Sequence, residues 1–129
     1  MLSDTETAAA HGERLSLVRR YISEHMDERL DRAVLARVAG FSIPHLQRLF
    51  ESHLGEDVGR YVRRVRLERA ARKLRMGAVD ITEVALAAGY DTHAAFTRAF
   101  KQRYGMSPRD FRELTCWTAS EMLRRDNER

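Results

Sequence analysis

The chain has 129 residues, of which 43% are hydrophobic, enough for a packed core, and its formal net charge is +4. This length corresponds to one domain or two very small ones, and the positive charge favours an anionic partner, nucleic acid more often than an acidic membrane. No stretch approaches the ~18 apolar residues that span a bilayer, the N-terminus lacks a secretory signal, and the single cysteine excludes an internal disulfide. We therefore expect a cytoplasmic protein.

The first residues, 1–12, are small and polar, and we expect them to form a frayed tail. Apolar residues at helical spacing begin after Glu13. They are Leu15, Val18, Ile22 and Met26. This spacing predicts a first helix that buries one face.

Capping and turn residues predict two further helices. Asp31 is placed to cap a short helix at 32–38, because an aspartate side chain accepts hydrogen bonds from backbone N–H groups in the first turn. Gly40 can adopt a positive φ at the end of this helix, and Ser42 can cap the next helix, at about 43–52. A short helix, a turn and a second helix are typical of a helix-turn-helix unit.

A long helix is predicted at 58–76, and its apolar residues form two successive stripes. The first stripe is Val58, Tyr61, Val62 and Val65, and the second is Leu67, Ala70, Ala71 and Leu74. At roughly 100° per residue, the second stripe points about 165° away from the first. We interpret this segment as a linker helix with one small unit packed at each end, on opposite faces. The alternative is a surface helix solvated by its many arginines.

Beyond Gly77, the pattern of a short helix, a turn and a longer helix returns, with Asp80 placed as a cap. The two predicted helices span about 81–88 and 92–104. A last helix is predicted to start at Ser107 and, by its apolar spacing, to include Phe111, Leu114, Trp117 and Met122. The final residues are too charged to pack.

The second half of the chain repeats the first after about 50 residues, which is the mark of a duplicated structural unit. The matching segments are LARVAGF at 35–41 with VALAAGY at 84–90, QRLF at 47–50 with TRAF at 97–100, and Gly55 with Gly105. We predict an all-α fold in which two homeodomain-like helix-turn-helix subdomains are joined by the linker helix. The predicted layout is a tail at 1–12, subdomains at 13–57 and 77–112, the linker at 58–76, and a C-terminal helix and tail at 113–129.

These segments resemble the DNA-binding module of AraC/XylS-type transcription regulators. The resemblance rests on LARVAGFSIPHLQRLFESHLG, on the arginine-rich linker, and on ITEVALAAGYDTHAAFTRAFKQRYGMSPRDFR, and it covers about residues 14–112. The chain looks most like the single-module MarA/SoxS subgroup. The resemblance implies a monomer on double-stranded DNA that occupies an asymmetric promoter site and touches RNA polymerase.

The resemblance also assigns base-reading positions to the outer faces of two recognition helices. In this chain they are Pro44, Gln47 and Arg48 in the first unit, and His93, Ala94, Thr97 and Arg98 in the second. Pro44 stands where a tryptophan is typical of the subgroup, and Ala94 stands where a longer polar residue is usual.

The chemistry of these side chains suits the major groove, where base edges present a full pattern of donors and acceptors. Arg48 and Arg98 can each direct two donors at guanine, and Gln47 can pair with adenine through both amide atoms. Thr97 and Ala94 offer methyl contact with thymine, which should discriminate less between bases than a bidentate pair. We therefore expect the better-defined half of the DNA site to lie under the first unit, which carries both Gln47 and Arg48. The alternative for each arginine is a solvated surface charge.

A second set of residues is predicted to contact phosphates, which fix the position of a protein on DNA without reading its sequence. They are Ser42, Arg60, Arg64, Arg72, Lys101 and Ser107. The serines stand at helix N-termini, where free N–H groups attract anions, and the other residues supply positive charge. Some linker arginines must instead pair with Glu68 or remain in water, and His93 can reach either a base or a phosphate.

Neither a catalytic site nor a metal site is indicated. The five histidines show no ligand spacing with cysteine or carboxylate clusters, and no glycine-rich phosphate loop or nucleophile motif is present. Cys116 is interpreted as a small packed hydrophobe, with a redox sensor as the alternative. We predict that the protein has no cofactor and is not an enzyme.

The favoured function is a sequence-specific transcription regulator, an activator, that binds double-stranded DNA and associates with the nucleoid. One alternative is an architectural DNA binder indifferent to sequence, and another is a protein-interaction adaptor whose basic linker binds an acidic helix. Binding to selected and random duplexes at several salt concentrations separates these possibilities.

Overall fold

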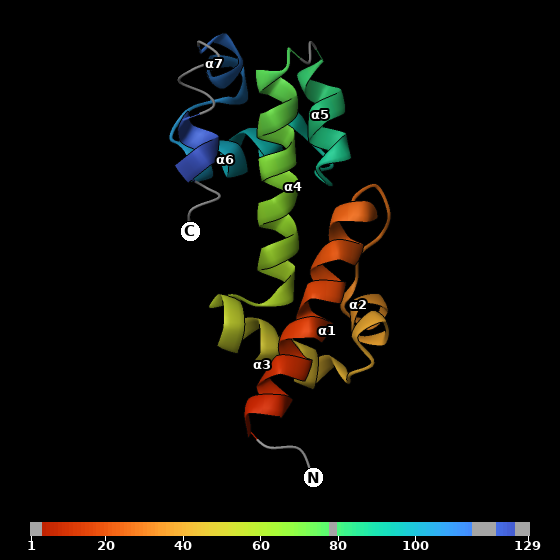
Figure 1. Cartoon of the computed structure of the whole chain (residues 1–129). Coiled ribbons are helices and arrows are strands. Elements are labelled where there is room, and N and C mark those ends of the chain that lie inside the picture. The colour runs from red at the N-terminus through yellow and green to blue at the C-terminus, as the bar shows by residue number, and fades with distance from the viewer. Residues whose placement is uncertain (1–3, 78–79, 115–120, 126–129) are drawn as a thin grey trace. The chain divides into compact units, whose positions relative to one another are not determined.

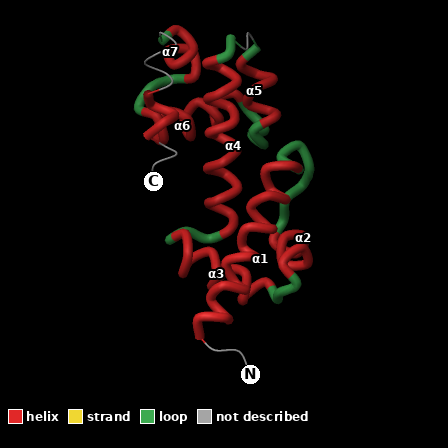
Figure 2. The backbone as a smooth tube through the Cα atoms, in the orientation of Figure 1, coloured by secondary structure: helices red, strands yellow, loops and turns green. Residues whose placement is uncertain are grey.

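The computed structural model describes residues 4–77, 80–114 and 121–125, and all regular structure in these ranges is helical (Figure 1 and Figure 2). The helices are α1 (Asp4–Glu24), α2 (Arg32–Ala39), α3 (Ile43–Leu54), α4 (Val58–Arg75), α5 (Ile81–Ala87), α6 (His93–Tyr104) and α7 (Pro108–Glu113), and residues 121–125 are also helical. The chain divides into two compact units, residues 1–63 and 64–129. The predicted all-α fold, with two helix-turn-helix units and a long linker helix, is confirmed.

The first unit is built around α1, which packs against α2 and α3. The apolar face predicted for α1 is buried, and Leu35, Leu46 and Phe50 face it with almost no exposed surface. The beginning of α4 completes this core through Val58, Tyr61 and Val62. The rings of Phe50 and Tyr61 meet edge to face with their centroids 5.4 Å apart.

The second unit has an aromatic core. Phe96, Phe100 and Phe111 are fully buried, and the ring centroids of Phe100 and Phe111 are 5.3 Å apart. Around them pack Leu67, Ala70, Ala71 and Leu74 from α4 and Val84, Ala85 and Ala88 from the α5 region. The two stripes of α4 therefore belong to two different cores, as predicted, although Val65 is only half-buried.

The predicted caps are formed. Asp31 Oδ1 accepts from the N–H of Val34 at 2.9 Å, and Asp80 Oδ1 accepts from Thr82 at 2.9 Å. The helix α6 is capped by Thr92, whose Oγ1 accepts from Ala95 at 3.0 Å. Each bond satisfies a backbone donor that the first turn of a helix leaves without an intrahelical partner.

Two predictions about the ends of the chain were wrong. Helix α1 begins at Asp4 and not near Glu13, because the alanines at 8–10 are the strongest helix formers and extend it. Helix α7 ends at Glu113, since Leu114 is extended with φ −65° and ψ 155° and packs half-buried on the core. The predicted continuation through Trp117 falls outside the described residues, and so does Cys116, whereas Leu123 is buried and Met122 packs against the same core.

Candidate nucleic-acid interface

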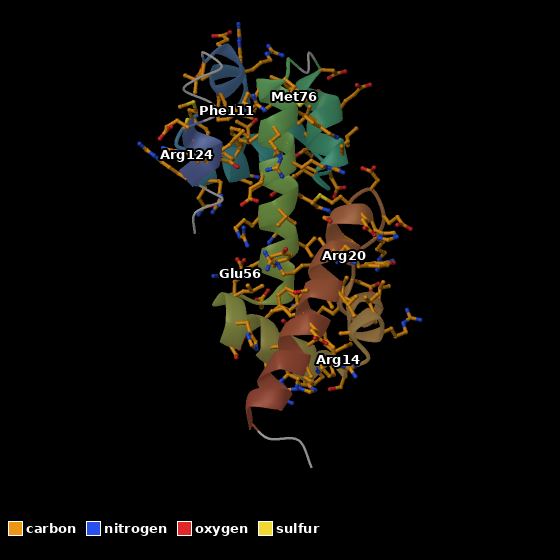
Figure 3. The ribbon with its side chains drawn as sticks, in the orientation of Figure 1. Arg14, Arg20, Glu56, Met76, Phe111 and Arg124 are labelled. Carbon is orange, nitrogen blue, oxygen red and sulfur yellow. The ribbon has the colours of Figure 1, made fainter. Side chains whose placement is uncertain are left out.

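Each unit contains a tight turn between its second and third helices, and an arginine from the preceding long helix lies over the turn glycine. Gly40 has φ +72°, and a Cβ placed there would meet Arg14 Nη1 at 2.8 Å. Gly89 has φ +91°, and a Cβ placed there would meet Arg66 Nη1 at 3.3 Å. Arg14, labelled in Figure 3, also donates from Nη1 to the carbonyl of Ala39 at 2.8 Å. Both turns therefore favour glycine because of their left-handed backbone, while the arginine tips that lie over them belong to flexible side chains.

The outer face of α3 carries two of the three residues predicted to read bases in the first unit. Ser42 caps this helix, Pro44 lies in its first turn, and both Pro44 and Arg48 are exposed. The opposite face buries Leu46, Leu49 and Phe50, which fixes the helix on the core. Arg48 is therefore presented from a rigid, capped helix, one turn after Pro44.

Gln47, the third predicted base-reading residue of the first unit, has a different environment. It is half-buried, and its Oε1 accepts a hydrogen bond from the backbone N–H of Val58 at 3.1 Å. Val58 is the first residue of α4 and is only 1% exposed, so this N–H has been removed from water. One of the two lone pairs of the Gln47 amide oxygen is thus engaged inside the protein.

The outer face of α6 carries the four residues predicted to read bases in the second unit. His93, Ala94 and Arg98 are exposed, whereas Thr97 is half-buried and its Oγ1 lies 3.4 Å from His93 Nδ1. The buried face is made by Phe96, Phe100 and Tyr104. The structure therefore brings all four residues to one helix, with Arg98 at the position that Arg48 has on α3.

The residues predicted to contact phosphates fall into three groups. Ser42 and Ser107 cap their own helices, accepting from His45 at 3.3 Å and from Asp110 at 3.1 Å. Arg60 and Lys101 are exposed, and Arg72 is half-buried.

Arg64, the remaining residue predicted to contact phosphate, is held by an ion pair. Its Nη1 lies 2.9 Å from Glu68 Oε1, and Arg103 Nη2 approaches the same oxygen at 3.2 Å. Glu68 is only 6% exposed, so this carboxylate depends on its two partners for charge balance. Sequence reasoning anticipated that a linker arginine could pair with Glu68, but it missed Arg103, whose sequence position carries no helical-spacing signal for this contact.

Two exposed residues of the α3 outer face have no role in the predictions made from the sequence. Ile43 is 39% exposed at the first position of the helix, and Glu51 is exposed one turn after Arg48. Glu51 corresponds to Lys101 when the two repeats are aligned through Arg48 and Arg98. The outer faces of the two helices therefore differ in charge at their third turn.

The carboxyl group of Asp57, at the start of α4, has a lowered pKa. Asp57 Oδ1 accepts from the backbone N–H of Arg60 at 2.9 Å, and this bond lowers the pKa of Asp57 below 3.8, against a smaller opposing effect of burial. The charges of Arg63, Arg32 and Arg60 lower it further. Asp57 is thus an ionised N-cap at physiological pH.

The part of the chain that the structure describes offers neither a metal-binding cluster nor a membrane-spanning helix. No group of three or more histidine, cysteine, aspartate or glutamate side chains is arranged to hold a metal ion there. Within the same residues, none of the helices combines the length and apolar character needed to cross a membrane.

The geometry defines a class of protein: two helix-turn-helix units, each of which presents an arginine from the outer face of a capped recognition helix. Comparison with known proteins gives the family. Residues 35–114 match the family described as "Helix-turn-helix domain". The regulatory protein SoxS of Salmonella typhimurium is 32% identical over 103 residues, which cover 80% of this chain and 96% of SoxS.

Three further relatives extend this result. The transcriptional regulator Rob of Salmonella typhimurium is 36% identical over 99 residues, which cover 77% of this chain but 34% of Rob, so the chain spans about a third of the length of that relative. The DNA-binding domain of the global transcriptional factor AdpA, solved in complex with a target DNA, superposes with a TM-score of 0.70 and 28% identity, covering 77% of this chain and 89% of AdpA's domain. A transcriptional regulator of Chromobacterium violaceum, described by its AraC-type DNA-binding domain, superposes with a TM-score of 0.76 and 26% identity, covering 81% of this chain and 93% of that chain. The chain belongs to the AraC family of helix-turn-helix, DNA-binding transcription regulators, which are not enzymes.

Proposed function

We propose that the protein is a sequence-specific transcription activator that places α3 and α6 in adjacent major-groove segments of an asymmetric promoter site. The observation that carries this proposal is the recurrence of an exposed arginine, Arg48 and Arg98, at the same position of two capped, 12-residue recognition helices. An arginine at such a position can direct two donors at guanine. Two major-groove contacts by one chain are separated by about one turn of B-DNA, roughly 34 Å.

The finer assignments follow from this mode of binding. Base contacts are assigned to Pro44, Arg48, His93, Ala94, Thr97 and Arg98, and phosphate contacts to Ser42, Arg60, Arg72, Lys101 and Ser107. For Arg64, the pairing with Glu68 favours a role in stability over a role on DNA. Binding as a monomer, contact with RNA polymerase and location on the cytoplasmic nucleoid are proposed from the likeness to SoxS-type regulators.

The test is selection of bound duplexes from a random pool, followed by affinity measurements on selected and random duplexes at several salt concentrations. We expect an enriched asymmetric sequence and an affinity ratio above about 10³. Equal affinity for selected and random duplexes would indicate an architectural binder. Absence of binding to any duplex at low salt would instead favour a protein-interaction adaptor.

A further inference from the structure

Gln47 connects the recognition helix of the first unit to the first residue of α4. Its Oε1 accepts from Val58 N–H at 3.1 Å, across the short loop that separates α3 from α4. The N–H of the first helical residue has no intrahelical partner, and Val58 is 1% exposed, so without Gln47 this donor would be buried and unsatisfied.

The second unit offers an internal comparison for this contact. Aligning Arg48 with Arg98 and Gly55 with Gly105 pairs Asp57 with Ser107, and these two residues are the N-caps of α4 and α7. In each case the side chain accepts from the N–H three residues on and the carbonyl accepts from the N–H four residues on. The alignment is therefore structural as well as sequential.

The same alignment pairs Val58 with Pro108, and both residues are almost completely buried. Proline has no N–H and is well suited to the first position of a helix. At the position of Gln47 the second unit has Thr97, which lies beside His93 instead. The second unit therefore lacks both the buried N–H, because Pro108 has none, and a glutamine at the position of Gln47.

We propose that Gln47 is a positioning residue that holds α3 to α4, and that its bond to Val58 N–H orients the amide so that Nε2, not Oε1, is presented to DNA. This inference rests on the proposed function for its DNA-binding part. Bidentate pairing with adenine needs one acceptor and one donor from the amide. Val58 N–H occupies one of the two lone pairs of Oε1 and holds this oxygen toward the start of α4. In this orientation Gln47 donates to the purine N7 that every base pair presents, and pairing with adenine through both amide atoms requires the amide to turn away from Val58. The base pair under Gln47 therefore discriminates weakly.

The first test needs no DNA and uses Q47A, V58P and the double variant in the full chain. Proline at position 58 reproduces the arrangement of the second unit and removes the N–H. Q47A should lower the thermal midpoint by about 4–8 °C, the shift expected when one such bond is lost in a unit of this size, and should speed hydrogen exchange at Val58. In the V58P background, Q47A should change the midpoint little. An equal loss in both backgrounds would overturn the inference.

The second test measures base preference at the pair under Gln47, by substitution across a selected duplex. The unmodified protein should bind adenine and guanine there within a small factor. V58P frees Oε1, so adenine preference should rise by about fivefold or more, and Q47A should abolish that rise. The inference fails if the unmodified protein already prefers adenine strongly through Gln47 and V58P leaves that preference unchanged.

Two further variants keep the inference testable if V58P does not fold. Q47E retains an acceptor for Val58 N–H, so it should recover at least half of the midpoint lost in Q47A; an equal loss would contradict the proposed bond. T97A is the matched control in the second unit and should leave the midpoint unchanged, because Pro108 has no N–H to satisfy. If no duplex is selected at all, the proposed function fails while the stability test of Gln47 still stands.

Discussion

At the start of α4 the first unit has Asp57 and Val58, and at the start of α7 the second unit has Ser107 and Pro108. The two pairs cap their helices in the same way, yet only the first leaves a buried N–H that a recognition-helix side chain must satisfy. The two units thus share the same helix-capping arrangement. Small differences within it decide which side chains remain available for DNA.

The repeat also extends further back than the sequence comparison reached. Leu15, Val18 and Ile22 of α1 occupy the positions that Leu67, Ala70 and Leu74 occupy on α4. In this alignment Arg14 matches Arg66, and each lies over the turn glycine of its own unit. The buried apolar positions and the turn glycines agree between the units, whereas several other positions differ.

The largest expected difference between the units concerns Glu68, which has Ser16 at its matched position. Ser16 is exposed, whereas Glu68 is buried between Arg64 and Arg103. Removing one partner of a buried ion pair leaves uncompensated charge, so Glu68→Ala should lower the free energy of unfolding by about 3 kcal/mol. Ser16→Ala should change it by less than about 0.5 kcal/mol.

Denaturant unfolding followed by amide resonances from each unit would measure this effect. The loss should appear first in residues of the second unit. A loss in Glu68→Ala no larger than that in Ser16→Ala would show that the ion pairs contribute nothing to stability.

The next largest effect concerns Arg48 and Arg98, which are exposed at equivalent positions. Arg48→Ala and Arg98→Ala should each cost about 1–3 kcal/mol on a selected duplex and relax preference at one base pair. With the oxygen of Gln47 engaged, the two halves of the site should be more similar than the sequence suggested. A base-pair substitution scan measures both, and Arg20→Ala, on the exposed side of α1, serves as the control.

Equal losses on selected and random duplexes would reassign either arginine to a phosphate contact. A much larger penalty in the half under Arg48 would restore the original expectation that the first unit dominates recognition.

A smaller effect concerns the two N-caps, Asp57 and Ser107, whose contributions to stability should respond differently to pH. Asp57→Ala and Ser107→Ala should each cost about 1 kcal/mol at pH 7. The pKa of Asp57 is lowered on folding, so its contribution is complete above the unfolded value of about 3.8 and is lost as the pH falls through the lowered folded value. The hydroxyl of Ser107 does not titrate in this range.

Urea unfolding at pH 7 and between pH 2 and 4 measures the contrast. The stability difference between the unmodified protein and Asp57→Ala should shrink in acid, whereas that for Ser107→Ala should not. Asp57→Asn keeps an amide oxygen as a cap and should lose less than Asp57→Ala at pH 7. A pH-independent difference for Asp57→Ala would contradict the assigned pKa shift.

Much of this architecture could be predicted because it depends on local signals. Helical spacing, caps such as Asp31 and Ser42, and the repeated turn glycines each constrain a few neighbouring residues, and they determined the all-α fold and the two outer faces. The engagement of Gln47 with Val58 and of Arg103 with Glu68 joins residues on different helices. Such contacts depend on three-dimensional packing, which no spacing rule encodes.

The smallest expected effect arises at the third turn of the recognition helices, where Glu51 of α3 matches Lys101 of α6 and both are exposed. A phosphate contact by a cation releases a counterion, which an anion at the same place cannot do. Glu51→Lys should therefore raise affinity for all duplexes by less than about 1 kcal/mol at physiological salt, since exposed charges are screened. It should also steepen the salt dependence by about one phosphate contact. Lys101→Glu should do the reverse, because it gives α6 the charge of α3.

Titration of selected and random duplexes from low to physiological salt measures both changes, which should be equal on the two duplexes. Glu24→Lys adds the same charge at the exposed end of α1 and is the matched control. If Glu24→Lys steepens the salt dependence as much as Glu51→Lys, the effect belongs to net charge, and the third turn of α3 does not approach the DNA backbone.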